Sequence, residues 1–276
     1  MSEYTVVVGL ANPETAERLM GIGCLLAKQF DGRVEAVTVI DTDRAAPEAT
    51  PGHHDRMTAA YDLLAVAETV AGRCGARHEG HIAIGRPVAE VLDELAESTD
   101  ASLIIIGFSE HNRPGGDDSE FERLTDEMAT RAPCDLLVAR LVGNVSYQRV
   151  LVPVREELNL DVRCSVMAAL HARYGSVVDV VHFAHSTDDV ARTREQLREW
   201  LDRRGMADGV SVRVDVHEDP AQAIVRASVD YDLVMLGAGP LHEVRRRYFG
   251  PTTEYVATHA ACSTFLLRNR DITSAG

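Results

Sequence analysis

Along the chain, short apolar runs typical of strands alternate with segments whose hydrophobic residues have helical spacing. The resulting order of strands and helices occurs twice. Short apolar runs rich in β-branched residues, such as 34–40 and 103–107, indicate buried strands, and segments with helical spacing lie between them. In the first half the pattern predicts strands at 4–10, 33–40, 78–83, 102–107 and 135–140, with helices at 13–29, 56–73, 87–98 and 120–131. In the second half it predicts strands at 149–155, 177–184, 209–216, 232–237 and 263–268, with helices at 157–173, 187–204, 220–229 and 251–260. This alternation is typical of a parallel sheet covered by helices on both faces.

The two halves are diverged copies of one α/β unit. TVVVGL near the start matches RVLVPV, LIIIG matches LVMLG, and RAPCDLLVAR matches HAACSTFLLR. The offset falls from 144 residues at the first strand to 128 at the matched cysteines Cys134 and Cys262, so the loops have changed length. A repeat of this length indicates two whole domains, which we place at 1–142 and 147–270. Each is expected to hold five parallel strands in the order 3-2-1-4-5.

Polar residues, prolines and glycines mark several boundaries of the predicted helices and loops. Asn12-Pro13 and Asp219-Pro220 each place a capping side chain before a proline, which favours a helix start. The segment 41–56 is polar and rich in proline and glycine, and it is interpreted as a mobile loop or lid.

Composition narrows the class of protein. The formal net charge is −15, and Lys28 is the single lysine among 28 basic residues. This acidic, lysine-poor composition is similar to that of haloarchaeal and other salt-loving proteins, and its field opposes binding to nucleic acid. No apolar run approaches the roughly 20 residues that a membrane span needs, and no leader precedes the first strand, so we expect a cytoplasmic protein without membrane insertion. Five cysteines without paired spacing argue against disulfides and zinc, and buried thiols are the favoured interpretation.

Candidate ligand chemistry is concentrated after the fourth strand of the second half. Ligands of parallel sheets bind at the carboxyl ends of the strands. There Gly237 and Gly239 open a loop containing Arg245 and Arg246, and Gly250 precedes Thr252 and Thr253 at a helix start. Backbone N–H groups and guanidinium groups suit a phosphate. Two alternatives stay open: the arginines pair with carboxylates elsewhere, and the threonines are ordinary helix-start residues.

These features resemble those of a tandem universal stress protein. The resemblance rests on strand LVMLG, Gly237, Gly250 thirteen residues later, and helix TTEYVATHAAC leading into strand STFLL. It implies two flavodoxin-like (adenine nucleotide alpha hydrolase-like) domains whose last strands pair within the chain. It also implies an adenine-nucleotide site, for ATP, AMP or a related ligand, formed by a glycine loop and an aspartate after the first strand.

The chain departs from that family pattern in both halves. In the second half, Arg155 stands at the aspartate position and Pro240 at the middle glycine position. In the first half, Leu10 stands at the aspartate position, and five acidic residues from 110 to 122 would repel phosphate. We therefore expect a weakened adenine-nucleotide or anion site in the second domain and a degenerate site in the first.

Neither catalysis nor metal binding is expected. The sequence has no GxSxG elbow, no GxxxxGK[ST] loop and no HExxH motif. His78 and His81 are three apart on a predicted strand and therefore face opposite sides, and His182 and His185 lie near the second-domain site.

Two functions remain. The first is a non-enzymatic stress-response or regulatory protein with the weakened site. The alternative is a nucleotide-independent interaction module acting on a membrane transporter or another partner protein, because the opening VVVGLANPETAERL resembles domains attached to transporters. A homodimer of the whole chain is compatible with both.

Overall fold

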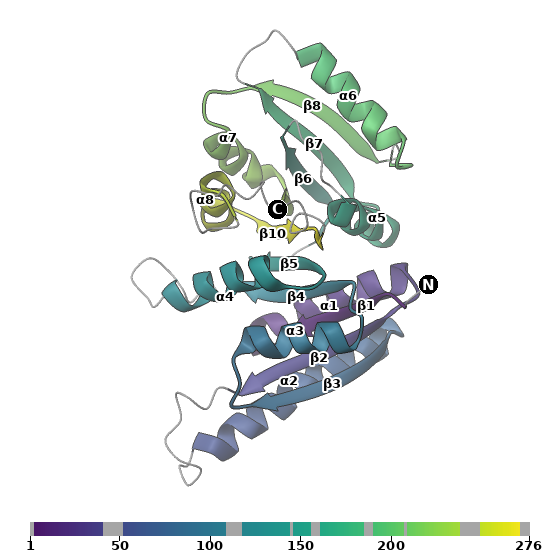
Figure 1. Cartoon of the computed structure of the whole chain (residues 1–276). Coiled ribbons are helices and arrows are strands. Elements are labelled where there is room, and N and C mark those ends of the chain that lie inside the picture. Colours follow the sequence, from purple (N-terminus) through teal and green to yellow (C-terminus); the bar gives the residue numbers. More distant parts are fainter. Residues whose placement is uncertain are drawn as a thin grey trace. The chain divides into compact units, whose positions relative to one another are not determined.

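The chain folds into two compact units, which lie within Met1–Ala139 and Arg140–Ile272 (Figure 1). This computed structural model describes residues 3–40, 52–108, 118–143, 146–155, 161–184, 190–206, 209–237 and 249–270. We call the two units unit 1 and unit 2 and describe each by itself.

Unit 1 is a five-stranded parallel sheet with helices on both faces (Figure 1). Its strands, in the order β3-β2-β1-β4-β5, are β1 (Thr5–Gly9), β2 (Arg33–Ile40), β3 (Arg77–Ile84), β4 (Leu103–Phe108) and β5 (Asp135–Arg140). Its helices are α1 (Pro13–Gln29), α2 (Gly52–Cys74), α3 (Val88–Ser98) and α4 (Asp118–Arg131). The contacts join α1 to α2 and α3 to α4, as expected when the crossovers reverse direction after β3.

Unit 2 repeats this arrangement. Its strands, in the order β8-β7-β6-β9-β10, are β6 (Arg149–Val154), β7 (Val177–Ala184), β8 (Val210–Val216), β9 (Leu233–Gly237) and β10 (Ser263–Arg268). Its helices are α5 (Asp161–Tyr174), α6 (Val190–Asp202), α7 (Pro220–Ala227) and α8 (Pro251–His259), with a 3₁₀ turn at Ser228–Asp230. The predicted fold class and strand order are confirmed in both units.

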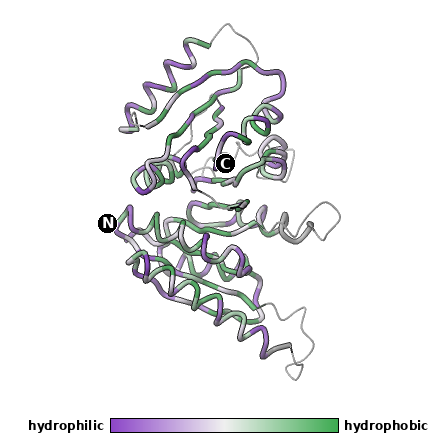
Figure 2. Tube along the Cα trace, turned by 180° about the vertical axis from the view of Figure 1, so that it is seen from behind, coloured by the Kyte–Doolittle hydropathy of each residue, from purple (hydrophilic) through white to green (hydrophobic). Residues whose placement is uncertain are grey.

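The central strands form the core of each unit. Val6, Val7 and Val8 of β1 are completely buried, and so are Val150, Leu151 and Val152 of β6. In Figure 2 the hydrophobic colour follows the strands, whereas the helices alternate between hydrophilic and hydrophobic along their length. The continuous apolar runs in the sequence therefore reflect strands covered on both faces.

Local capping signals account for the starts of helices α1 and α7. Asn12 accepts a hydrogen bond from the backbone N–H of Glu14 through its side chain, and Asp219 does the same for Gln222, as predicted. Several boundaries differ from the prediction, and two of the differences concern helix starts. Helix α2 already begins at Gly52 rather than at residue 56, and Pro87 is the N-cap of α3 rather than its first residue. The remainder of the predicted loop, 41–51, lies outside the described residues.

Candidate functional site

The carboxyl ends of β6 and β9 in unit 2 carry two of the residues that the sequence assigned to a ligand site. Gly237 is the last residue of β9, where it pairs with Leu267 of β10. Arg155 follows the end of β6 directly and is exposed. Because β6 and β9 are parallel neighbours, both residues lie at the same edge of the sheet.

Arg163 is the charged side chain closest to this strand end among those described. A β-carbon on Gly237 would lie 2.7 Å from Cζ of Arg163, so the guanidinium packs against the glycine backbone. Its Nη1 donates to the carbonyl oxygen of Pro153, on β6, at 3.3 Å. Only 7% of Arg163 is exposed, and this burial lowers the pKa of its guanidinium to about 10. The group therefore remains charged at neutral pH, and a buried cation favours an anion beside it.

Neighbouring side chains fix the same strand ends. Nδ1 of His182, on β7, lies 3.1 Å from the carbonyl oxygen of Val154, which assigns the proton to Nδ1. The side-chain oxygen of Asn269 accepts from the backbone N–H of Val162, at the start of α5, at 3.3 Å. His182 thus lies beside the candidate site, as the sequence placed it, while His185 lies outside the described residues.

Helix α8 is the next described helix after β9 along the chain. Gly250 is its N-cap and makes no side-chain capping bond, and Pro251 is its first residue. The N–H groups of Thr252 and Thr253, in the first turn, have no acceptor within the helix and carry its positive dipole end. The three remaining assigned residues, Gly239, Arg245 and Arg246, lie outside the described residues, and so does Pro240.

At the corresponding glycine of unit 1, the nearest side chain is apolar. Val6 pairs with Leu103 and Val150 pairs with Leu233, so the first strands of the two units correspond at an offset of 144 residues. Leu19 then corresponds to Arg163, and its Cδ1 would lie 2.8 Å from a β-carbon on Gly107, the equivalent of Gly237. The same helix position thus covers the same glycine with a leucine in unit 1 and with a guanidinium in unit 2.

This register also corrects one sequence assignment. At an offset of 144, Leu10 corresponds to Val154, and Ala11 corresponds to Arg155. Ala11 is therefore the unit 1 counterpart of Arg155. Strand β6 extends one residue further than β1. Neither alanine nor leucine offers a polar group to a ligand.

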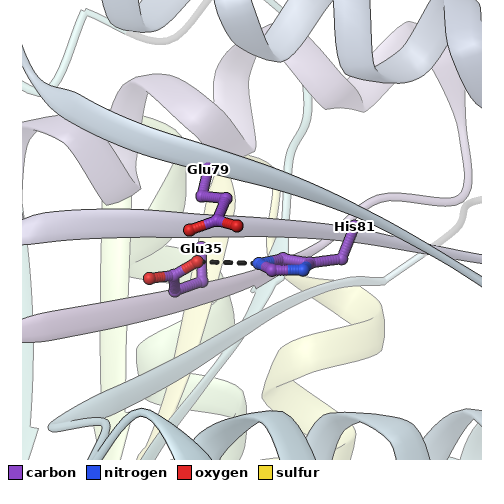
Figure 3. Close-up of side chains that lie close together, drawn as sticks. All are labelled: Glu35, Glu79 and His81. Carbon is purple, nitrogen blue, oxygen red and sulfur yellow. Dashed lines mark hydrogen bonds and ion pairs between the residues drawn. The ribbon is translucent and has the colours of Figure 1, made fainter.

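A second polar cluster, which the sequence reasoning missed, lies on β2 and β3 of unit 1 (Figure 3). It consists of Glu35, Glu79 and His81, whose ligand atoms all lie within 4.8 Å of one another. His78 and His81 do occupy alternate faces of the strand, as expected. The register of β2 against β3 brings Glu35 close to His81. Glu35 pairs directly with Glu79 across the two strands. That register cannot be read from the spacing of residues along β3.

The described carboxyl ends of β6 and β9 in unit 2 thus carry the buried guanidinium of Arg163 and the exposed Arg155. The strand order and the helices on both faces place each unit in the flavodoxin-like class of α/β domains. Such domains bind ligands at the carboxyl edge of the sheet. The model of the Universal stress protein family matches residues 4–140 and 146–268, so the chain belongs to this family and contains two of its domains in tandem.

Similar proteins include both free-standing and transporter-associated examples. The Na⁺/H⁺ antiporter NhaS5 of Synechocystis is 26% identical over 257 residues, which cover 90% of this chain and 35% of the antiporter. A universal stress protein from Archaeoglobus fulgidus superposes with a TM-score of 0.69 at 15% identity, covering 97% of each chain. The cytoplasmic domain of a prokaryotic cation chloride cotransporter superposes with a TM-score of 0.62 at 11% identity, covering 97% of this chain and 96% of that domain.

These comparisons define the fold and the family. The chain spans about a third of the length of the antiporter that it matches. Among the described residues, none of the helices combines the length and the hydrophobicity that a bilayer-spanning segment requires.

Proposed function

We propose that the chain is a non-enzymatic regulatory protein whose unit 2 binds a small anionic ligand at the carboxyl ends of β6 and β9. The observation that carries this proposal is the guanidinium of Arg163 packed against Gly237. A charged group in that position supplies an attraction for phosphate that Leu19 cannot supply in unit 1. Exposed Arg155 adds a second positive charge at the same sheet edge.

The ligand class is an adenine nucleotide such as ATP or AMP, as the family resemblance implies, held more weakly than in members that retain the aspartate. Arg155 stands where that aspartate would meet the ribose, so recognition shifts from the sugar toward the phosphates. Gly250, Thr252 and Thr253 would add backbone N–H donors, and Gly239, Arg245 and Arg246 belong to the same proposed site.

Thermal unfolding tests the ligand. A ligand that binds only the folded state raises the unfolding midpoint as its concentration increases. We expect ATP and AMP to raise the midpoint of the wild-type chain in high salt, and Arg163→Met to abolish most of the rise. Arg198→Ala, which removes an exposed arginine on α6, is the matched control and should keep the rise. No rise with either nucleotide, or an equal rise in Arg163→Met, removes the proposal.

A second candidate function is a nucleotide-independent module that regulates a cation transporter from the cytoplasmic face. It is favoured by the antiporter whose similarity covers 90% of this chain. Co-expression with a Na⁺/H⁺ antiporter, followed by transport assays in inverted vesicles, tests it. The module should change the rate or the pH dependence of exchange with no nucleotide present. Unchanged exchange, with no antiporter retained on the tagged chain, argues against this function.

The association of the units is a further part of the proposal. Strands β5 and β10 are each the last strand of their own sheet, and we propose that they pair with each other within one chain, since an uncovered edge invites aggregation. Hydrogen exchange tests this: the amides of both strands should be protected in dilute monomer. Light scattering in high salt distinguishes the 30.1 kDa chain from a homodimer of the whole chain, which is compatible with both candidate functions.

A further inference from the structure

The cluster of Glu35, Glu79 and His81 lies on one face of the β2–β3 pair, away from helix α2. A β-carbon on Gly80 would lie 3.4 Å from the side chain of Leu64, on α2, so Gly80 faces that helix. Glu79 and His81 flank Gly80 and therefore point to the other face, together with Glu35, the cross-strand partner of Glu79. Figure 3 shows the three side chains converging between the two strands.

The charges in this cluster are unusual for paired strands. Two carboxylates directly opposite each other repel, and Glu35 is only 1% exposed, which makes its charge costly. A positive charge close to the carboxylates offsets this cost, and Arg33 supplies part of it at Glu35. A cation bound by both Glu35 and Glu79 would offset the repulsion between the two carboxylates.

The two carboxylate oxygens of Glu35 have different neighbours. Oε1 forms an ion pair with Nε of Arg33 at 2.9 Å, and Arg33 in turn lies 3.9 Å from Glu3. Oε2 faces Nε2 of His81 at 2.8 Å. Arg33 thus fixes the orientation of the carboxylate from one side and leaves Oε2 for a ligand shared with the imidazole. A carboxylate ligand held on its second oxygen is a common outer-sphere arrangement in metal sites.

The cluster is also open to solvent. Glu79 is exposed, and 31% of the His81 side chain is accessible, so an ion can enter without opening the core. One buried and one exposed carboxylate with an accessible imidazole form a three-ligand set that leaves positions for water.

We propose that Glu35, Glu79 and His81 bind a divalent transition-metal ion, with Zn²⁺ as the representative. An imidazole nitrogen combined with two carboxylate oxygens suits Zn²⁺, Mn²⁺ or Fe²⁺, whereas Mg²⁺ and Ca²⁺ prefer oxygen ligands alone. Arg33, together with Arg77, which pairs with Glu3 at 2.5 Å, moderates the affinity by repulsion. The site lies in unit 1, so it is independent of the anion site proposed in unit 2.

Isothermal titration of the metal-free full chain with ZnCl₂ tests the site. We expect one Zn²⁺ per chain, and binding weakened at least tenfold in His81→Gln and in Glu79→Gln. His78→Gln, on the same strand but on the opposite face, is the matched control and should bind as tightly as the wild type. Because Glu79 is exposed, its substitution leaves the fold intact.

Replacing Zn²⁺ by Co²⁺ supplies a spectroscopic readout. The visible absorption of bound Co²⁺ should appear in the wild type and in His78→Gln and disappear in His81→Gln. A chain that binds no Zn²⁺ at millimolar concentration overturns the proposal, and so does equal binding by the wild type and His81→Gln. Binding of Mg²⁺ as tight as that of Zn²⁺ also overturns it.

Discussion

Arg163 and Gly237 are packed so closely that a β-carbon at residue 237 would lie 2.7 Å from the guanidinium carbon. The equivalent pair in unit 1, Leu19 and Gly107, has the same geometry, with 2.8 Å to a leucine methyl group. One helix-to-strand contact has therefore been kept in both copies, while its chemistry has changed from apolar to cationic. A β-carbon in either copy would require the side chain that covers the glycine to move.

The two glycines should respond unequally to a methyl group. Gly107→Ala forces the fully packed Leu19 to move, so we expect a loss of about 1–3 kcal/mol in the free energy of unfolding. Gly237→Ala should cost less, because the end of a long side chain can shift more easily than Leu19. Denaturant unfolding of the full chain measures both changes. Gly21→Ala, on α1 with nothing within 4 Å, is the control and should instead stabilise by roughly 0.5–1 kcal/mol.

Tyr231 and Asp179 form a second testable pair. The Tyr231 hydroxyl donates to Oδ2 of Asp179 at 2.5 Å, and Ser211 donates to the other oxygen. Burial and this hydrogen bond raise the pKa of Tyr231 to about 12. We expect Tyr231→Phe to lose about 1 kcal/mol of stability at pH 7 and to remove the tyrosine transition centred at about pH 12 in an ultraviolet titration. A titration curve unchanged by the substitution contradicts this assignment.

The same pair gives an acid dependence. Burial acts to raise the pKa of Asp179, but hydrogen bonds from Ser211 and Tyr231 outweigh it, so the pKa is lowered on folding. A carboxyl with a lowered folded pKa stabilises the fold above its unfolded pKa of about 3.9, and this stabilisation is lost as the pH falls through the folded value. The stability difference between the wild type and Tyr231→Phe should therefore shrink below pH 4. Denaturant unfolding at pH 3 and pH 7 compares them.

The start of helix α1 depends on one side-chain cap. Asn12 Oδ1 lies 2.9 Å from the backbone nitrogen of Glu14. Asn12→Ala should lower the free energy of unfolding by about 1 kcal/mol, because the N–H loses its acceptor. Asn12→Asp is the control and should retain most of the stability, since a carboxylate accepts the same bond. Equal losses in both variants would show that the cap contributes nothing.

Thiol reactivity provides a test of burial. Cys24, Cys134 and Cys262 are buried, whereas Cys74 and Cys164 are partly exposed. Burial is the main cause that raises the pKa of Cys24 to about 12 and that of Cys262 to about 11. Under native conditions iodoacetamide should modify Cys74 and Cys164 first, as followed by peptide mass spectrometry. Rapid modification of Cys24 or Cys262 would contradict the packing described for α1 and β10.

The repeated hydrophobic pattern was sufficient to predict two buried parallel sheets, because apolar runs such as Val6–Val8 and Ile104–Ile106 favour strands covered on both faces. The strand order came with the flavodoxin-like fold that the family resemblance implies. The capping residues Asn12 and Asp219 were predicted for a similar reason, since their signals are local. The sequence analysis did not identify Arg163 as a site residue. The 144-residue offset makes Arg163 the equivalent of Leu19, which occupies a buried position. A charged residue at a buried helical position was the available signal.

Long-range contacts account for what the sequence did not predict. Glu35 lies 44 residues from Glu79, and their pairing depends on the register of β2 against β3. Edge strand β3 is only partly covered, so its polar pattern alone does not reveal which residues face α2. The early start of α2 was missed because Gly52 and the two histidines after it are weak helix formers.

Equilibrium dialysis with radiolabelled ATP and AMP most directly tests whether unit 2 is an anion-binding regulatory domain. For the full chain in high salt, we expect saturable binding at one site per chain. Binding should weaken at least tenfold in Arg163→Met and stay unchanged in Arg198→Ala and in Leu19→Met, which alters the equivalent position of unit 1. Saturable binding of the same strength in Arg163→Met, or its loss in Leu19→Met, would contradict the assignment of the ligand to unit 2.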